Sequence, residues 1–304
     1  MSFTAQDVKN LREKTGCGMM DCKKALNASN GNMEAAIDFL REKGLAAATK
    51  KSGRIAAEGL AMAFTNEEGN LGVAIEVNAE TDFVAKNAEF QAFVKTCADT
   101  IMKFNPKDVE ELLKCQAVGS ELTVADLLQE KILTIGENIK IRRFVRYEGV
   151  VSTYIHAGGK ICVMVKFDAD ENVAKTEKFK EYAKDVAMQI AAVNPAYLNK
   201  ESVPEEVLAH EKKILTEQII NDGKPENIAQ KIVAGRIGKF YKENCLLEQQ
   251  FVKDNNLTIS SYTQNISKEL NGDIKILSFA RLEKGEGIEK REDNFADEVA
   301  SMIK

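Results

Sequence analysis

Residues 69–75 read GNLGVAI, and residues 159–165, 90 positions further along the chain, read GKICVMV. Each heptapeptide begins at a glycine turn and continues into apolar residues, which is typical of a turn followed by a buried strand. The tripeptide EGL at 58–60 recurs as EGV at 148–150, again 90 positions later. Matches at one constant spacing indicate an internal duplication, in which each copy holds two strands joined by a Gly/Asn turn.

The similarity continues beyond the strands after a shift of one residue. VAK at 84–86 matches VAK at 173–175, 89 positions later. Apolar residues at helical spacing follow in both copies, which predicts amphipathic helices over about 89–103 and 176–192. The sequence therefore predicts two related α+β subdomains, each made of a small sheet and helices.

The duplication also suggests where the domain boundaries fall. We expect the first copy to span 56–145 and the second to span 146–282, with a helical insertion at about 200–241. Apolar residues of the insertion keep a near-heptad spacing on both sides of an NDGKP turn, which predicts an antiparallel coiled-coil hairpin. Such a hairpin could pack on its own chain or pair with a partner, and a homodimer through it stays open.

Two further segments lie outside the copies. Residues 1–55 predict a module of three short helices and a linker, because Thr4 begins a capping-box pattern and glycines within 16–18 break the chain. The third helix is expected over about 32–43 and should end before Gly44. The acidic segment 283–304 predicts a C-terminal helical module with Phe295 on its apolar stripe.

The composition restricts the kind of function. Lys and Arg number 42 against 47 Asp and Glu, so the net charge of −5 argues against direct nucleic-acid binding. The first residues lack a signal-peptide pattern, and no run approaches the roughly 18 apolar residues of a membrane span. We therefore expect a cytoplasmic protein without a membrane partner.

Residues suited to catalysis or metal binding are sparse. The six cysteines are scattered without a CxxC pair and the chain has only two histidines, so neither a zinc ion nor another cofactor is expected. P-loop, GxGxxG and HExxH motifs are absent, and neither His156 nor His210 has a nucleophile near it in the sequence. The chain is therefore expected not to be an enzyme, although a catalyst built only on carboxylates stays open.

The segment EVNAETDFVAK at 76–86 is the main candidate for a binding site. It leaves a strand, turns through polar residues and enters a helix, which Thr81 or Asp82 could cap through a side-chain oxygen. In the second copy the residue that matches Phe83 is Asn172, so the fold does not require an aromatic side chain there. We therefore expect Phe83 to be exposed and to contact a partner, with the filling of a local gap as the alternative.

Met19 and Met20 follow the glycine turn at the start of the second predicted helix. Methionine is usually a core residue, but two in succession at a helix start suggest that they divide between core and surface. We expect one of them to face out as an adaptable contact.

Four parts of the sequence carry a resemblance to a known family. They are LREKTGCGMMDCKKAL at 11–26, EVNAETDFVAK at 76–86, IGENI at 135–139 followed by IRR at 141–143, and GEGIEK at 285–290. In these stretches, in this order and over essentially its whole length, the chain resembles the elongation factor Ts family. Departures are small: Cys17 and Ala79 stand where other small residues are common.

The resemblance implies a fold and a partner. The fold would be an N-terminal ubiquitin-associated-like three-helix module, two related α+β core subdomains, an inserted antiparallel coiled-coil hairpin and a C-terminal helix. The partner would be elongation factor Tu, a translational GTPase, on which the chain would act as a guanine-nucleotide exchange factor without covalent chemistry. The alternative is an adaptor that binds a folded protein partner without exchange activity.

The resemblance also implies roles for individual residues. The segment that displaces Mg²⁺ from the partner would be Thr81, Asp82, Phe83 and Val84. Further contacts with the partner would come from Arg12, Met19, Met20, Lys23, Ile135, Gly136, His156 and Phe295.

Overall fold

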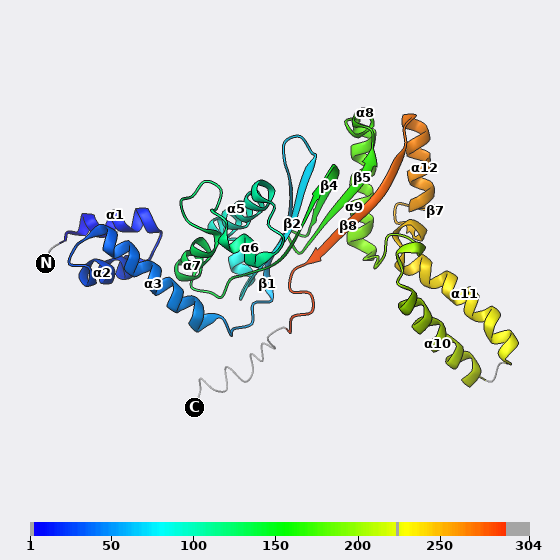
Figure 1. Ribbon diagram of the computed structural model, residues 1–304, viewed down its shortest axis with the longest axis horizontal. Coiled ribbons are helices and arrows are strands. Elements are labelled where there is room, and N and C mark those ends of the chain that lie inside the picture. The colour runs from blue at the N-terminus through cyan, green and yellow to red at the C-terminus, as the bar shows by residue number, and fades with distance from the viewer. Residues whose placement is uncertain (1–2, 223–224, 290–304) are drawn as a thin grey trace. The chain divides into compact units, whose positions relative to one another are not determined.

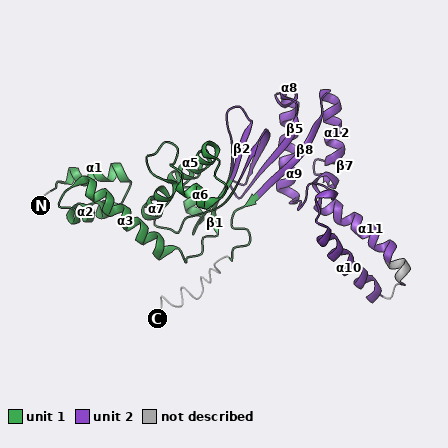
Figure 2. Cartoon of the chain, viewed as in Figure 1, with its two compact units in different colours: residues 1–62, 75–144, 282–304 green, residues 63–74, 145–281 purple. Residues whose placement is uncertain are grey.

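A computed structural model describes residues 3–222 and 225–289, and Figure 1 shows the elements along the chain. The chain divides into two compact units, which are coloured separately in Figure 2. The first unit comprises Met1–Met62, Ile75–Phe144 and Leu282–Lys304, and the second comprises Ala63–Ala74 and Val145–Arg281.

The first unit begins with three helices, α1 (Ala5–Thr15), α2 (Met19–Ala28) and α3 (Met33–Lys51). Thr4 caps α1 through the predicted capping box, and Gly16 ends it at φ 66°, a left-handed conformation that glycine adopts without strain. Apolar side chains from the three helices and the turn after α1 form one core: Val8, Leu11, Cys17, Cys22, Ala25, Leu26, Ala36 and Leu40. The three helices expected in this segment are therefore present.

The third helix is longer than the sequence predicts. An end was expected at Gly44, yet α3 continues to Lys51. Gly44 is buried, and a Cβ on it would lie 3.4 Å from the backbone oxygen of Gln129 in α7 (Val124–Ile135). The glycine thus does not stop the helix but lets α3 pack closely on α7, while the alanines at 46–48 favour helix.

A small sheet and four further helices follow the three N-terminal helices along the chain. The strands β1 (Glu58–Thr65), β2 (Leu71–Ala79) and β3 (Lys140–Glu148) form a three-stranded sheet in the order β1-β2-β3. The helices besides α7 are α4 (Asp82–Ala85), α5 (Ala88–Phe104) and α6 (Val109–Lys114). α5 is the amphipathic helix predicted at 89–103, and it buries Phe90 and Phe93.

The second unit is built on a sheet of β4 (Val150–His156), β5 (Ile161–Ala169) and β8 (Ile274–Glu283), in the order β4-β5-β8. β4 and β5 are antiparallel, with a register that runs from Val150 opposite Phe167 to His156 opposite Ile161. The other elements, apart from the insertion, are α8 (Glu171–Ala174), α9 (Glu177–Val193), β6 (Gln250–Phe251), β7 (Asp254–Thr258), α12 (Ile259–Leu270) and two 3₁₀ turns at Lys200–Ser202 and Leu246–Glu248. α9 packs on β4 and β5 and brings its aromatic residues against the Phe167 ring.

The duplication is visible in the lengths of the elements. β2 and β5 have nine residues each, α4 and α8 have four each, and α5 and α9 have seventeen each. Glu80 and Thr81 separate β2 from α4, whereas Asp170 alone separates β5 from α8. The one-residue shift between the copies therefore falls directly before the short helices.

A helical hairpin occupies the insertion, as the heptad spacing predicts. α10 (Glu205–Asn221) and α11 (Glu226–Asn244) pack against each other, and Figure 1 shows α11 running back beside α10 in the opposite direction. Their shared core is Leu215, Ile219, Val233 and Ile237. Pairing of this hairpin with a second copy of the chain stays a prediction.

The mixed α+β class predicted from the sequence is confirmed by these sheets and helices. The domain boundaries and the ubiquitin-associated likeness of residues 1–55 stay predictions. The C-terminal helix expected in 283–304 falls mostly on residues 290–304, which lie outside the described residues together with Phe295. In the described part of the chain, no helix combines the length and the apolar character that a membrane crossing requires.

Candidate functional site

The short helix α4 carries a strongly exposed apolar side chain. Phe83 is 78% exposed, more than any other large hydrophobic residue among those described, while the adjacent Val84 is buried. The Lys86 ammonium lies 5.8 Å from the centroid of the Phe83 ring and 3.0 Å from the Asp82 carboxylate. The expected exposure of Phe83 is confirmed, and the alternative, that it fills a local gap, is wrong. Residues 81–84 are called the TDFV turn below.

Thr81 occupies the N-cap position of α4, but its side chain makes no capping hydrogen bond. Its hydroxyl donates to Glu137 Oε1 at 2.7 Å, and its backbone N–H donates to Glu137 Oε2 at 3.0 Å. The capping role considered for Thr81 is therefore wrong, because a carboxylate from another segment is the stronger partner. Asp82 pairs with Lys86, whose hydrogen bond and charge lower the pKa of the Asp82 carboxyl.

A second carboxylate, that of Glu80 in the segment of Thr81, binds back to the segment that carries Glu137. Glu80 Oε1 accepts a hydrogen bond from the backbone N–H of Asn138 at 2.6 Å and lies 3.3 Å from Arg54 Nη1. Glu80 and Glu137 thus each bind the segment that carries the other, and we call Glu80, Thr81, Glu137 and Asn138 the carboxylate clamp. The sequence marks IGENI at 135–139 as a motif, but a contact between residues 56 positions apart leaves no local pattern that reveals it.

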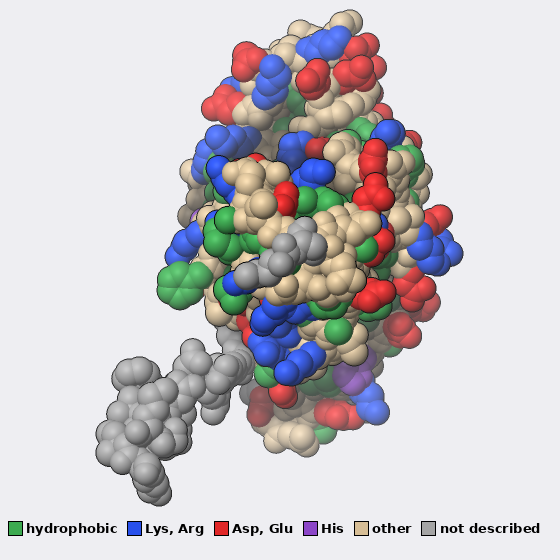
Figure 3. All heavy atoms as spheres, turned by 90° about the vertical axis from the view of Figure 1, so that its left-hand side faces the viewer, with side chains coloured by type: hydrophobic (Ala, Val, Ile, Leu, Met, Phe, Trp, Pro, Cys, Tyr) green, Lys and Arg blue, Asp and Glu red, His purple; other side chains and the backbone are tan. Residues whose placement is uncertain are grey.

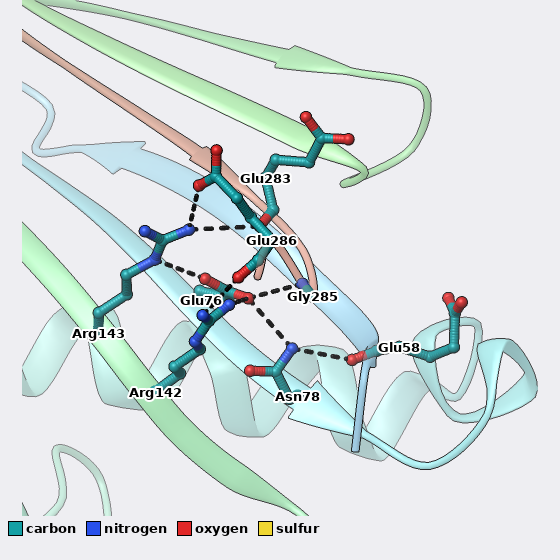
Figure 4. A network of polar contacts seen from close by, with 8 residues as sticks. All are labelled: Glu58, Glu76, Asn78, Arg142, Arg143, Glu283, Gly285 and Glu286. Carbon is teal, nitrogen blue, oxygen red and sulfur yellow. Dashed lines mark hydrogen bonds and ion pairs between the residues drawn. The ribbon is translucent and has the colours of Figure 1, made fainter. Parts of the chain in front are cut away.

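Glu76 is buried within β2, four residues before Glu80, and its carboxylate joins three segments of the chain, as Figure 4 shows. Its carboxylate accepts hydrogen bonds from Arg142 Nη1 at 2.9 Å and from Arg143 Nε at 2.6 Å. It also accepts one from the backbone N–H of Gly285 at 2.8 Å. Three of the stretches that stand out in the sequence therefore meet in one polar network.

The C-terminal stretch needs glycine where it meets this network. Gly285 has a φ of 70°, and a Cβ on it would collide with the carbonyl oxygen of Ala57. The next residue, Glu286, pairs with Arg143 at 2.9 Å. GEG at 285–287 therefore combines close backbone approach with a charge that anchors the segment.

In this network, hydrogen bonds shift the pKa values of the charged groups more than burial does. Burial raises the pKa of Glu76, but the bonds from Gly285, Arg142 and Arg143 more than offset it, so the pKa lies below its usual value. Burial lowers the pKa of Arg143, and its bonds to Glu286 and Glu76 more than offset that, so the pKa is raised. Each buried charge of the network therefore has an oppositely charged or hydrogen-bonding partner, and the network ties β2, β3 and the segment at 285–286 together.

The contacts predicted in the N-terminal helices lie on the surface. Met19 and Met20 are 54% and 62% exposed, so both methionines face out where only one was expected to do so. The core side of α2 is already filled by Cys22 and the alanine and leucine that follow it, which leaves no place for either. Arg12 and Lys23 are exposed as well. Figure 3 shows basic and acidic side chains interspersed with small apolar groups, rather than one field of a single charge.

The remaining predicted contacts differ in how they relate to the TDFV turn. Ile135 is half-buried at the end of α7, and Gly136 ends that helix at φ 87°, directly before Glu137 of the clamp. His156 is exposed at the end of β4 in the second unit, with Nδ1 3.2 Å from the Tyr154 hydroxyl oxygen. The structure thus joins two of the predicted segments, 81–84 and 135–136, through the clamp in the first unit.

Metal-ligating side chains do not gather in the part of the chain that the structure describes. Over residues 3–222 and 225–289, no three His, Cys, Asp or Glu side chains are placed to hold a metal ion. Burial raises the pKa of the Cys17, Cys22 and Cys97 thiols, which makes them poor nucleophiles at neutral pH. What the site offers is a projecting aromatic ring on a braced turn.

The fold and the site therefore define a mixed α+β protein whose main surface feature is an exposed aromatic anchor. The model of the family described as Elongation factor TS matches residues 80–286. Elongation factor Ts of Clostridium kluyveri is 52% identical over 99% of this chain and 99% of its own. The corresponding proteins of Clostridioides difficile, 47% identical over 100% and 99%, and Trichlorobacter lovleyi, 48% identical over 99% and 98%, are similar throughout. The chain belongs to the elongation factor Ts family, and its role is that of a translation elongation factor.

Proposed function

We propose that the chain is a guanine-nucleotide exchange factor that binds elongation factor Tu with GDP, displaces Mg²⁺ and promotes release of the nucleotide. The observation that carries this proposal is the 78% exposure of Phe83 on a turn held by the carboxylate clamp. Family membership supports the choice of partner.

Exchange requires no covalent chemistry. A GTPase holds GDP through backbone N–H groups of its phosphate loop and through a bound Mg²⁺. A protein that binds the GTPase more tightly when the phosphate and Mg²⁺ sites are distorted weakens nucleotide binding by the same factor. The chain would act in this way, as a binding protein and not as an enzyme.

Phe83 would supply the main differential contact. Burying its ring in the partner is worth about 2 kcal/mol, or about 30-fold in affinity. Asp82 is held ionised by Lys86 and would place a negative charge beside the partner's Mg²⁺ site. Thr81 and the buried Val84 would hold the turn in shape during the encounter.

The other predicted residues would extend the contact with elongation factor Tu. Arg12, Lys23 and the two exposed methionines at 19 and 20 would dock on its GTPase domain. Ile135 and Gly136 would add contacts beside the TDFV turn, and His156 would contact the partner away from the nucleotide. A homodimer through the helical hairpin stays part of the proposal, and sedimentation of the isolated chain tests it.

The exchange proposal is tested by release of fluorescent GDP from elongation factor Tu. The wild-type chain should accelerate release, and Phe83→Ala should remove most of the acceleration. Phe104→Ala is the matched control, because Phe104 is also an exposed phenylalanine of the first unit with a lysine over its ring, at 5.1 Å. Binding without acceleration by the wild-type chain would indicate an adaptor and would overturn the exchange function.

A further inference from the structure

The carboxylate clamp holds the backbone directly before Phe83. Thr81 presents two donors, its hydroxyl and its backbone N–H, to the two oxygens of Glu137 at 2.7 and 3.0 Å. In the other direction, Glu80 accepts a hydrogen bond from the backbone N–H of Asn138 at 2.6 Å. The Asn138 side-chain amide donates in turn to the Arg54 carbonyl oxygen at 2.8 Å.

This bidentate contact fixes a turn that is too short to fix itself. α4 has only four residues, and so short a helix gains few internal hydrogen bonds for the dihedral angles it must order. Two donors on one carboxylate restrain both the position and the rotation of the Thr81 peptide. Buried Val84 restrains the other side, so Phe83 stands between two anchors, one polar and one apolar.

Among the described residues, no such clamp is found at the matching place in the second copy of the repeat. Asp170 is the only residue between β5 and α8, and its side chain makes no capping hydrogen bond. Asn172, the residue of α8 that matches Phe83, is exposed as Phe83 is, but it is not aromatic. The extra residue that provides a Glu80–Thr81 pair therefore occurs in the copy that displays Phe83.

We propose that Glu137 is a positioning residue for Phe83, which it orients through Thr81 before the partner is met. The proposal rests on the exchange function given above. A preordered aromatic ring loses less conformational freedom on binding, so more of its burial appears as affinity for the exchange-competent complex. Glu137 itself need not touch the partner.

The first experiment measures the order of the turn without any partner. The chain has no tryptophan, so Phe83→Trp introduces a single tryptophan at this position, whose emission can be excited separately from that of the six tyrosines. Adding Glu137→Ala should remove much of the slowly decaying component of its fluorescence anisotropy. The same Glu137→Ala change in a Phe104→Trp chain is the control and should leave that probe's anisotropy unchanged. Unchanged anisotropy at position 83 would overturn the proposal.

The second experiment follows GDP release from elongation factor Tu. Glu137→Ala should raise the concentration needed for half-maximal acceleration by about tenfold, because a hydrogen bond to a charged group is of that size. Thr81→Val, which removes the hydroxyl only, should have a smaller effect, and Thr81→Ser, which keeps both donors, should lose less than Thr81→Val.

A double-variant cycle separates positioning from general destabilisation. If Glu137 acts through Phe83, Glu137→Ala should cause no further loss in a Phe83→Ala chain. A full additional loss would overturn the proposal, since it would place the effect of Glu137 elsewhere. If the wild-type chain fails to accelerate release at all, the exchange function falls, while the anisotropy experiment still decides whether Glu137 orders position 83.

Discussion

The short helices α4 and α8 follow the central strands of the two sheets, and they share two features of their packing and charge. Each buries a valine, Val84 or Val173, on its inner side. Each also holds an ion pair across one turn, 3.0 Å long between Lys86 and Asp82 in α4 and 2.6 Å long between lysine and glutamate in α8. At the exposed position between them, Phe83 in α4 is replaced by asparagine in α8. Folding therefore explains the valine and the ion pair but not the aromatic ring.

The two helices are also held in place differently. α4 is fastened by the polar bonds between Thr81 and Glu137, whereas α8 is approached by a glycine, Gly272, on which a Cβ would lie 2.5 Å from Val173. A polar, directional contact fixes orientation, while close apolar packing fixes position. The copy with the aromatic ring thus has the device that controls where a side chain points.

The largest expected effect concerns Glu76, whose counterpart in the second copy is Lys166. Glu76→Gln should lower the free energy of unfolding by about 3 kcal/mol at pH 7, because it leaves two arginines without their buried carboxylate. Lys166→Gln is the matched control and should change it by less than about 0.5 kcal/mol. Urea unfolding followed by circular dichroism measures both, and equal effects would contradict the contrast between the copies.

The stability difference between wild type and Glu76→Gln should depend on pH. The pKa of Glu76 is lower in the folded chain than the value of about 4.3 expected when unfolded, so its ionised form stabilises the fold. This stabilisation is fully present above the unfolded pKa and is lost as the pH falls through the folded one. The stability difference between wild type and Glu76→Gln should therefore be constant above about pH 5 and shrink below about pH 4. A difference that grows in acid would contradict this sign.

Next in size is the effect of making α4 like α8. Phe83→Asn should reduce the acceleration of GDP release by about 30-fold, which corresponds to the loss of about 2 kcal/mol of apolar burial. The unfolding free energy should stay within about 0.5 kcal/mol of wild type, because the ring is exposed in the free chain. A large loss of stability would show that Phe83 serves the fold after all.

The packing that holds α8 can be broken by a single methyl group. Gly272→Ala should destabilise the chain by about 1–3 kcal/mol, because its Cβ would overlap the buried Val173. Gly235→Ala in α11 provides the control: apart from its own stretch of helix backbone and its chain neighbours, no described atom lies within 4 Å of its Cβ position, so it should stabilise the helix by about 0.5–1 kcal/mol. Thermal unfolding of the two variants should therefore shift in opposite directions.

The smallest expected effect comes from the reverse exchange between the copies. Asn172→Phe should leave GDP release unchanged and should not rescue Phe83→Ala, because α8 lacks the clamp and the neighbouring contact residues. Rescue in the double variant would mean that an exposed phenylalanine on either short helix suffices.

Much of the fold was predictable because the spacing of apolar residues along the sequence indicates the strands and helices. The constant spacing of the repeat predicted the strand and helix that follow in each copy, and the heptad pattern predicted the hairpin of α10 and α11. The failure at Gly44 has a physical reason: glycine usually breaks helices, yet here it permits close contact with α7, which neighbouring sequence does not show. The candidate site was found only in part, through the mismatch between Phe83 and Asn172.

The sequence by itself determined the order of the elements, the duplication and the position at which one copy carries an aromatic ring that the fold does not need. Only the tertiary structure decided how that ring is supported. Glu137 lies 56 residues from Thr81, and Glu76 lies 209 from Gly285, so no local pattern reports either contact. Hydrogen bonds to a carboxylate depend on atoms a few ångströms apart in space, and that distance is set by the packing of the whole unit.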